Sequence, residues 1–397
     1  MVENPATAYE TIIRLLAVPR CVPPSSHDNS PDTDWVTQES IDWEQVWQIA
    51  DKARVTPLLH QATRKMPGLP DWWREGCQTA YQKTGIINTL RFQELKALLA
   101  DLREAGLGVI VLKGIALIEL IYGNPAVRPM VDMDLLLRKH DIPQAIEIMA
   151  GRDYRVSGGE IAPGSALAYE NEISIRKQGP YGWQVELHWN LFNSTYYQRR
   201  LPEDEWWRTA VAITIDREQT LCLSPEWMLI HLCGHLAFHH HGQGLLWWHD
   251  LAALLWTREG EIDWDYVLIQ AQAANMVLPL QNILPRLAME WNVPILPEIL
   301  TRLREIVPEP VEIEMQRASA EGVLSPGQRM LVDAKGLESW PKKARFLIHN
   351  VLPSATYMDA RYGISHPLIR PFYYPYRWLL GLSGFLHDTL HRWRDSR

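Results

Sequence analysis

The sequence has few cysteines, and none of them form a pair at the spacing of a metal or redox motif. The four cysteines among 397 residues are Cys21, Cys77, Cys222 and Cys233, which lie far apart or within apolar segments. This spacing argues against a disulfide framework and against a structural zinc site. It is typical of a reducing compartment, so we expect a cytoplasmic protein.

Long apolar runs and an excess of positive charge are also absent. No stretch reaches the roughly 18 uninterrupted apolar residues that a membrane helix needs. The first 20 residues lack the basic start and apolar run of a signal peptide. The formal net charge of −8 provides no general attraction for nucleic-acid phosphates. We therefore predict no transmembrane segment and no bulk nucleic-acid binding.

Phenylalanine is scarce, whereas tryptophan is abundant. The chain has 6 Phe against 18 Trp. Because tryptophan contributes a large buried area, most of these side chains are expected in the core or along grooves. The hydrophobic fraction of 47% and the charged fraction of 22% are ordinary for a soluble globular protein.

The pattern of apolar residues divides the chain into four regions. Residues 1–105 read mainly as helices, and residues 106–222 alternate short apolar strands with helices. Residues 223–300 return to a helical pattern, and residues 301–397 are richer in proline and charge and end in an aromatic and then basic tail. This order predicts an α+β fold, in which a small mixed-sheet core is flanked by N-terminal and C-terminal helical domains. The tail is expected to cap an apolar groove of its own chain, with a membrane surface or a partner as the alternative.

Short segments with strand or helix patterns follow one another within the predicted core. Strand patterns are β-branched or alternating, whereas helical patterns repeat at three or four residues. Predicted strands cover residues 108–114, 130–137, 171–178 and 181–192, and predicted helices cover residues 115–123 and 142–150.

Two aspartates stand two residues apart in the predicted strand 130–137. Successive side chains of a strand point to opposite faces, so Asp132 and Asp134 share one face while Val131, Met133 and Leu135 share the other. The two like charges repel unless a cation compensates them. Carboxylate oxygens suit Mg²⁺ or Mn²⁺, so the pair predicts a divalent metal site.

A third acid lies in the later strand 181–192. Its apolar residues occupy odd positions and its polar residues even positions, which places Glu186 on a polar face between Gln184 and His188. If this strand lies beside the strand of the two aspartates, three carboxylates converge.

A lysine and a glycine end the first predicted strand and lead into a helix. Glycine there lets backbone N–H groups approach a phosphate, and a helix N-terminus favours negative charge. Lys113 and Gly114 are therefore candidate phosphate-binding residues. Arg128 is a third, because a guanidinium can clamp a phosphate with two hydrogen bonds. An ion pair of Arg128 with Asp132 or Asp134 is the alternative.

The order of these motifs resembles the nucleotidyltransferase superfamily typified by polymerase beta. More narrowly, it is similar to the bacterial branch described as uncharacterised nucleotidyltransferases, over about residues 40–300. The resemblance rests on Leu112-Lys113-Gly114, a helix with Tyr122, Arg128 separated by three residues from Asp132-x-Asp134, and the later strand with Glu186. The sequence departs from the superfamily at Ile115, where a serine or glycine usually follows the glycine.

The resemblance implies an enzyme that moves a nucleoside monophosphate from ATP or another NTP to an acceptor and releases pyrophosphate. The acceptor would offer a hydroxyl or phosphate, on a small molecule or a protein. The resemblance also implies Mg²⁺ or Mn²⁺ as cofactor. Asp132, Asp134 and Glu186 would be the catalytic metal ligands, and Lys113, Gly114 and Arg128 would bind the nucleotide.

The histidines between residues 231 and 249 suggest other metal sites. A zinc-protease helix is excluded for His231 and His235, because Leu232 stands where that helix needs glutamate. His249-Asp250, with His235, matches the metal ligands of a His-Asp phosphohydrolase. Alternatively, His188, His235 and Asp250 line an acceptor cleft. For the chain as a whole, the alternative to an active enzyme is a catalytically inactive nucleotide-binding protein on the same scaffold.

Overall fold

A computed structural model of the chain describes residues 5–17, 35–38, 41–157, 164–192, 196–197, 201–310, 312–314, 316, 326–337 and 339–381. The contacts divide the chain into two compact units, which are described in turn. The first contains Met1–Leu136, Asp204–Gln272 and Met276–Val307, and the second contains Leu137–Glu203, Ala273–Asn275 and Pro308–Arg397. The last sixteen residues of the predicted aromatic and basic tail lie outside the described residues.

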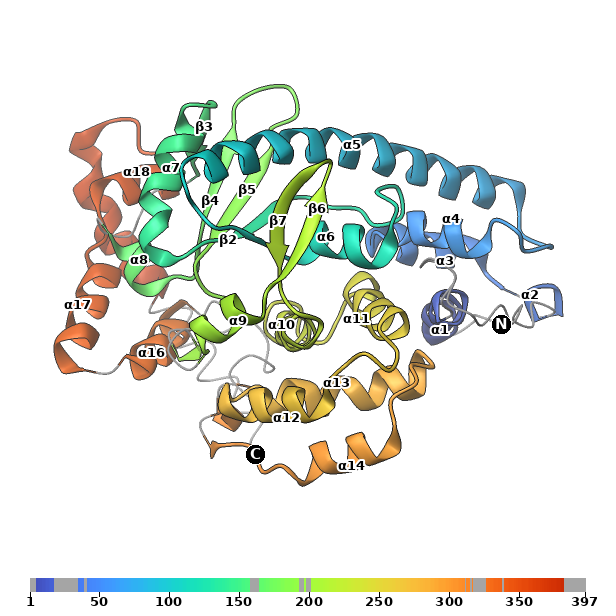
Figure 1. Cartoon of the computed structure of the whole chain (residues 1–397). Helices are drawn as coiled ribbons and strands as arrows, with labels where there is room; N and C mark the ends of the chain where they lie inside the picture. Colours follow the sequence, from blue (N-terminus) through green and yellow to red (C-terminus); the bar gives the residue numbers. More distant parts are fainter. Residues whose placement is uncertain are drawn as a thin grey trace. The chain divides into compact units, whose positions relative to one another are not determined.

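Helices form the first part of the first unit, as the sequence predicts. Helix α1 (Pro5–Leu16) packs against α3 (Trp43–Lys52) and α4 (Thr56–Thr63), and α2 is a single turn (Trp35–Gln38). Helix α5 (Asp71–Glu104) is 34 residues long and contacts both α4 and strand β7 (Glu218–Cys222) (Figure 1). Because α5 is so long, it can contact segments that are far apart in the sequence.

A mixed seven-stranded sheet has the order β3-β4-β5-β2-β1-β7-β6. Four of its strands belong to the first unit: β1 (Ile110–Val111), β2 (Met133–Leu136), β6 (Val211–Ile215) and β7. Strand β1 is antiparallel to β2 and parallel to β7, and β6 is antiparallel to β7. The mixed sheet and its helices confirm the predicted α+β class.

A short helical segment connects β1 to β2. Helix α6 (Lys113–Leu117) continues into a π-helical turn, η2 (Ile118–Tyr122), which Gly123 ends with a φ of 60°. Strand β2 begins at Met133, so Asp132 precedes the strand. Val131 also precedes the strand and is 53% exposed, whereas Met133 and Leu135 are buried, so the predicted shared face holds for Met133 and Leu135 but does not extend to Val131. The regular strand is shorter than its alternating sequence pattern.

The hairpin of β6 and β7 is absent from the sequence prediction. Its two-residue turn consists of Asp216 and Arg217, whose φ angles are 42° and 76°. Two left-handed residues in a row are typical of the turn that matches the twist of a tight hairpin. Glycine or asparagine usually marks such a turn, and neither is present here.

Further helices complete the first unit. They are α9 (Glu203–Thr209), α10 (Pro225–Phe238), α11 (Leu245–Thr257), α12 (Trp264–Ala273), α13 (Val277–Glu290) and α14 (Pro297–Glu305). The hydroxyl of Ser224 caps α10 by accepting a hydrogen bond from the Trp227 N–H at 3.4 Å. Both α10 and α11 are apolar on nearly every side and are buried, as expected for helices inside a domain.

The second unit contributes three antiparallel strands of the sheet, β3 (Tyr154–Val156), β4 (Glu172–Lys177) and β5 (Gln184–His188). Its helices are η3 (Lys139–Asp141), α7 (Ile142–Ala150), α8 (Ser165–Tyr169), α16 (Pro326–Gly336), α17 (Trp340–Val351), α18 (Ala355–Tyr362) and η5 (Pro367–Ile369). Ala334, Leu337 and Phe346 form a small core against which Tyr169 packs.

Many tryptophans lie in the core, as predicted. Five of the largest fully buried side chains are tryptophans, at positions 73, 206, 227, 248 and 291. Cys77, Cys222 and Cys233 are buried free thiols. Among the described residues, no helix combines the length and the apolar character required to cross a membrane.

Candidate functional site

Asp134 and Lys113 form an ion pair at the junction of β2 and α6. Asp134 is 3% exposed, and the Lys113 Nζ donates a hydrogen bond to its Oδ1 at 2.8 Å. The backbone N–H of Leu112 donates to the Asp134 carbonyl at 3.0 Å. Both the backbone and a side chain of the segment after β1 therefore hold Asp134 in place.

Lys113 has a left-handed backbone conformation. Its φ angle is 46°, which a residue with a side chain adopts at a cost of about 1–3 kcal/mol. This angle turns the chain from β1 into α6 at the position from which the ammonium group reaches Asp134. Strain of this kind concentrates at functional sites, so it supports Lys113 as a functional residue.

Asp132 lies close to Asp134 but just outside the strand. Burial raises the pKa of Asp132, and the Asp134 carboxylate raises it further, whereas Lys113 lowers it. Lys113 therefore acts on both carboxylates, and the Arg128 guanidinium also lowers the pKa of Asp132. Such a pair of acids is stabilised by a divalent cation.

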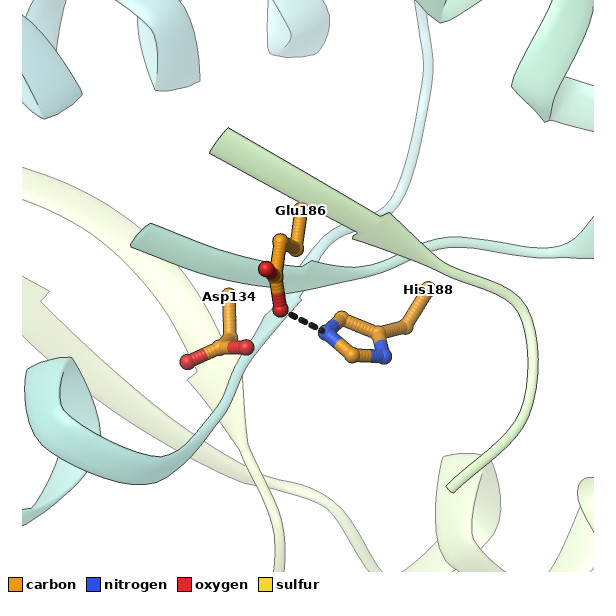
Figure 2. Close-up of side chains that lie close together, drawn as sticks. All are labelled: Asp134, Glu186 and His188. Carbon is orange, nitrogen blue, oxygen red and sulfur yellow. Dashed lines mark ion pairs between the residues drawn. The ribbon is translucent and has the colours of Figure 1, made fainter. Parts of the chain in front are cut away.

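Asp134, Glu186 and His188 form a group that can hold a metal ion. One ligand atom from each lies within 4.8 Å of the others, and this is the single such group found among the described residues (Figure 2). The His188 Nε2 lies 3.7 Å from the Glu186 Oε2. Asp132 is not part of this group.

Glu172 is a further acid that the sequence reasoning missed. It lies opposite His188 in the β4–β5 register, and its Oε2 is 3.1 Å from the His188 Nδ1. A histidine that ligates a metal through one nitrogen commonly has its other nitrogen held by a carboxylate. The alternation of β4 was a usable signal for Glu172, but its pairing with His188 requires the register, which the sequence does not provide.

Gly114 packs where a side chain would not fit. A Cβ atom at this position would lie 2.7 Å from the Arg128 Nη1 and 2.8 Å from the Met130 Cγ. The absence of a side chain is therefore required by packing. This reason differs from the predicted approach of a backbone N–H to a phosphate.

Arg128 pairs with an acid that the sequence analysis assigned elsewhere. Its Nε lies 2.9 Å from the Asp250 Oδ1 and its Nη2 2.7 Å from the Asp250 Oδ2. Arg128 is 6% exposed and Asp250 is fully buried. The predicted alternative of an ion pair with Asp132 or Asp134 is therefore wrong. The contacts also give no support to a phosphate clamp, because the guanidinium is buried and already bound.

Tyr122 and His249 complete this buried network, which we call the Arg128 network (Tyr122, Arg128, His249 and Asp250). The Tyr122 hydroxyl donates to the Asp250 Oδ1 at 2.8 Å and lies 2.9 Å from the His249 Nδ1. Asp250 is thus neither a metal ligand nor part of an open cleft. This contradicts both its predicted place in an acceptor cleft and the His-Asp phosphohydrolase alternative.

Helix α5 holds the segment between Tyr122 and β2. The Asn88 Nδ2 donates to the carbonyls of Pro125 and Arg128, at 2.7 and 2.8 Å. The Arg91 guanidinium donates to the Met130 carbonyl. These two residues were not predicted as part of the site, because nothing in the local sequence of a long amphipathic helix indicates which carbonyls its polar side chains bind.

Histidines of α10 and of the two residues that follow it gather in a second group, the histidine cluster (His231, His235, His239 and His240). The Nε2 atoms of His235 and His240 are 3.0 Å apart, and the His240 ring stacks on Trp247 at 3.3 Å between centroids. Burial and Lys113 both lower the pKa of His235 and of His240. The cluster therefore lies near the lysine that pairs with Asp134.

The comparison with protein families agrees with the resemblance in the sequence. The model of the uncharacterised nucleotidyltransferase family matches residues 39–291, which is more than half of the chain. A solved structure of an antigenic nucleotidyltransferase-like protein from Paracoccidioides brasiliensis is similar to this chain at 16% identity. The similarity covers 53% of this chain and 96% of that one, with a TM-score of 0.36. No curated protein gives a significant match. By the extent of the family match, the chain belongs to the uncharacterised nucleotidyltransferase family.

Proposed function

We propose that this chain is a metal-dependent nucleotidyltransferase. It would move a nucleoside monophosphate from an NTP to a hydroxyl or phosphate of a small-molecule or protein acceptor, and it would release pyrophosphate. The observation that carries the proposal is the group of Asp134, Glu186 and His188, with Lys113 bound to Asp134, in a member of this family.

The donor atoms of the group fit a divalent cation. Asp134 and Glu186 offer carboxylate oxygens, His188 offers a nitrogen, and Asp132 adds a further carboxylate nearby. Mg²⁺ prefers oxygen ligands alone, whereas Mn²⁺ also accepts imidazole. Asp132 and Asp134 with Glu186 would suit Mg²⁺, and use of His188 would favour Mn²⁺, so both ions belong in the test.

Each side chain has a role that its position supports. A bound cation would neutralise charge on the triphosphate and polarise the α-phosphate. Asp132, Asp134 and Glu186 would hold the cation, and Lys113 would leave Asp134 to contact the phosphates. The acceptor oxygen forms a bond to the α-phosphorus, and the bond from that phosphorus to the bridging oxygen breaks. Pyrophosphate leaves with the bond electrons. The proton of a hydroxyl acceptor passes to solvent water where Glu186 holds the cation, or to Glu186 where Asp132 and Asp134 hold it alone.

The proposal is tested with an NTP labelled at the α-phosphate, incubated with Mg²⁺ or Mn²⁺ and panels of small-molecule and protein acceptors. The substitution Asp134→Asn keeps the shape of the side chain but removes its charge. We expect label transfer to fall on the order of 100-fold or more, because metal-based stabilisation is worth several kcal/mol and each 1.36 kcal/mol is tenfold.

Asp153→Asn is the matched control, since Asp153 is exposed and has a φ angle of 65° that asparagine tolerates well. Its transfer rate should equal that of the wild type. Equal transfer by wild type and Asp134→Asn would contradict the proposed site. Nucleotide binding without transfer to any acceptor, with or without metal, would favour the inactive alternative.

A further inference from the structure

Cations and other histidines surround the His235–His240 pair, and one of the cations, Lys113, also pairs with Asp134. Apart from burial, these groups are the main causes that lower the pKa of the two histidines. Lys113 of α6 acts on both histidines, as does His239. His231 acts on His235, whereas Arg54 and His241 act on His240. An arginine, a lysine and several imidazoles gathered at one place favour an anion over a cation as the ligand.

The pair is held in a fixed geometry at the edge of solvent. The two Nε2 atoms share one hydrogen over 3.0 Å, and His240 stacks on Trp247. The Arg54 guanidinium lies over the Trp247 ring, 5.9 Å from its centroid. Arg54 and His239 are exposed, whereas His235 and His240 are half-buried. An anion from solution can therefore reach a site whose donors are already in place.

We propose that His235, His240 and Lys113 form an anion site for the phosphate groups of the nucleotide, and that binding of the anion is coupled to uptake of one proton by the histidine pair. The inference rests on the proposed function, because it assigns these residues to the triphosphate of the same NTP. It extends that function by placing phosphate recognition at the C-terminal end of α10 and just after it, far in sequence from the Lys113-Gly114 turn.

The coupling follows from the electrostatics of the empty site. Burial and the neighbouring positive charges lower the pKa of His240 to about 4 and that of His235 well below its usual value. Both rings are then neutral near pH 7. A phosphate beside them supplies negative charge, which favours the protonated form. One ring of the pair donates its Nε2–H to the Nε2 of the other, so the Nδ1 of the donating ring carries no proton. The incoming proton binds this Nδ1. This adds a charged donor for the anion.

The test uses the full-length protein without metal, in EDTA, and pyrophosphate as the probe. Isothermal titration calorimetry at pH 7 in two phosphate-free buffers with different ionisation enthalpies counts the protons taken up. The wild type should take up about one proton per pyrophosphate bound. His240→Gln should bind about tenfold more weakly, and without proton uptake, because a hydrogen bond to a charged group is lost.

Two other variants keep the result interpretable. His140→Gln is the matched control, because its side chain is 77% exposed, and it should behave as the wild type. Arg54→Ala should weaken binding but keep the proton uptake. This variant, together with the wild-type proton count, decides the matter if thermal melting shows that His240→Gln is unfolded.

Failure of this inference is distinguishable from failure of the proposed function. Equal pyrophosphate affinity of wild type and folded His240→Gln, no binding to the wild type, or binding without proton uptake would each overturn the inference, even if nucleotidyl transfer is observed. Conversely, proton-coupled binding that His240→Gln abolishes would support the anion site, even in a protein that transfers no label to any acceptor.

Discussion

The Arg128 network and the histidine cluster show two opposite ways of treating charge within the same unit. In the Arg128 network, the guanidinium meets the Asp250 carboxylate, and Tyr122 and His249 complete the contacts away from solvent. In the histidine cluster, the groups that lower the pKa of His235 and His240 are cations and other histidines, and some of them are exposed. The first arrangement pairs its charges internally, whereas we propose that the second takes up an anion from solution.

The two regions meet at consecutive residues. Lys113 belongs to the surroundings of the histidine cluster, whereas the space beside Gly114 is occupied by Arg128 and Met130. Arg128 itself lies four residues before Asp132 in the chain. We infer that the Arg128 network fixes the backbone at Lys113 and Gly114, and that the position of Lys113 beside the histidine cluster depends on it. Separate substitutions should therefore affect stability in one region and anion binding in the other.

The largest effect is expected for Arg128→Met, which leaves the buried Asp250 carboxylate without its cation. Removing one partner of a buried ion pair costs about 3–5 kcal/mol, because the remaining charge is desolvated and unpaired. We expect the free energy of unfolding in urea to fall by that amount. The double variant Arg128→Met, Asp250→Leu should recover much of the loss, because it leaves no buried charge.

Arg208→Met is the control for this prediction. Arg208 pairs with Glu205 at the surface, where its side chain is 67% exposed, and surface pairs contribute little. Its effect should be far smaller than that of Arg128→Met. If the two single variants were equally stable, the Arg128 network could not be what holds the junction.

The second effect is a dependence of stability on pH that comes from His249. Burial lowers the pKa of His249 to about 4, although the Asp250 carboxylate acts in the opposite direction and raises it. The usual pKa of histidine in an unfolded chain is about 6.5. Below about pH 6.5 the unfolded chain binds a proton that the native state binds only near pH 4. Stability is therefore full above about pH 6.5 and falls by about 3 kcal/mol as the pH falls to 4.

His249→Phe should remove this dependence. Between pH 4 and 6.5, the slope of the unfolding free energy against pH should decrease by about one proton, or about 1.4 kcal/mol per pH unit. Pyrophosphate should not alter the contribution of His249 to this slope, since this residue is fully buried in the Arg128 network. An unchanged slope in His249→Phe would show that other groups cause the acid sensitivity.

The sequence predicts those parts of the site that depend on neighbouring residues. Alternation and motif order indicate Asp134, Glu186 and Lys113 as site residues. Ser224 followed by Pro225 is a typical helix start that can be read from the sequence, and α10 begins at Pro225 with Ser224 as its N-cap. These features are local, because each is determined by a few consecutive residues and by the period of a strand or helix.

The parts that sequence reasoning misses depend on contacts between distant segments. Arg128 and Asp250 are separated by 122 positions, and only the packing of α11 brings them together. The β6–β7 hairpin escapes prediction because Asp216 and Arg217 adopt left-handed angles without the glycine that usually indicates them. The role of Gly114 is also non-local, since Arg128 and Met130 define the space it leaves free.

The smallest of the three stability effects is expected for Gly114→Ala, where two contributions oppose each other. Alanine is preferred to glycine in a helix by up to about 1 kcal/mol. Its methyl group, however, would lie 2.7 Å from the Arg128 Nη1, and overpacking of this kind costs about 1–3 kcal/mol. Because the bond to Asp250 holds the guanidinium, we expect the clash to prevail and the protein to be destabilised in urea.

The same variant distinguishes packing from phosphate approach as the reason for the glycine. Gly108→Ala is the control, since its methyl group would meet the Trp207 ring at an ordinary 3.4 Å. If packing requires Gly114, the alanine variant loses stability but binds pyrophosphate within about twofold of the wild type, about 0.4 kcal/mol. Unchanged stability with a clear loss of pyrophosphate affinity would reverse the assignment. Gly114 would then belong to the anion site, and the boundary between the two regions would lie one residue further along the chain.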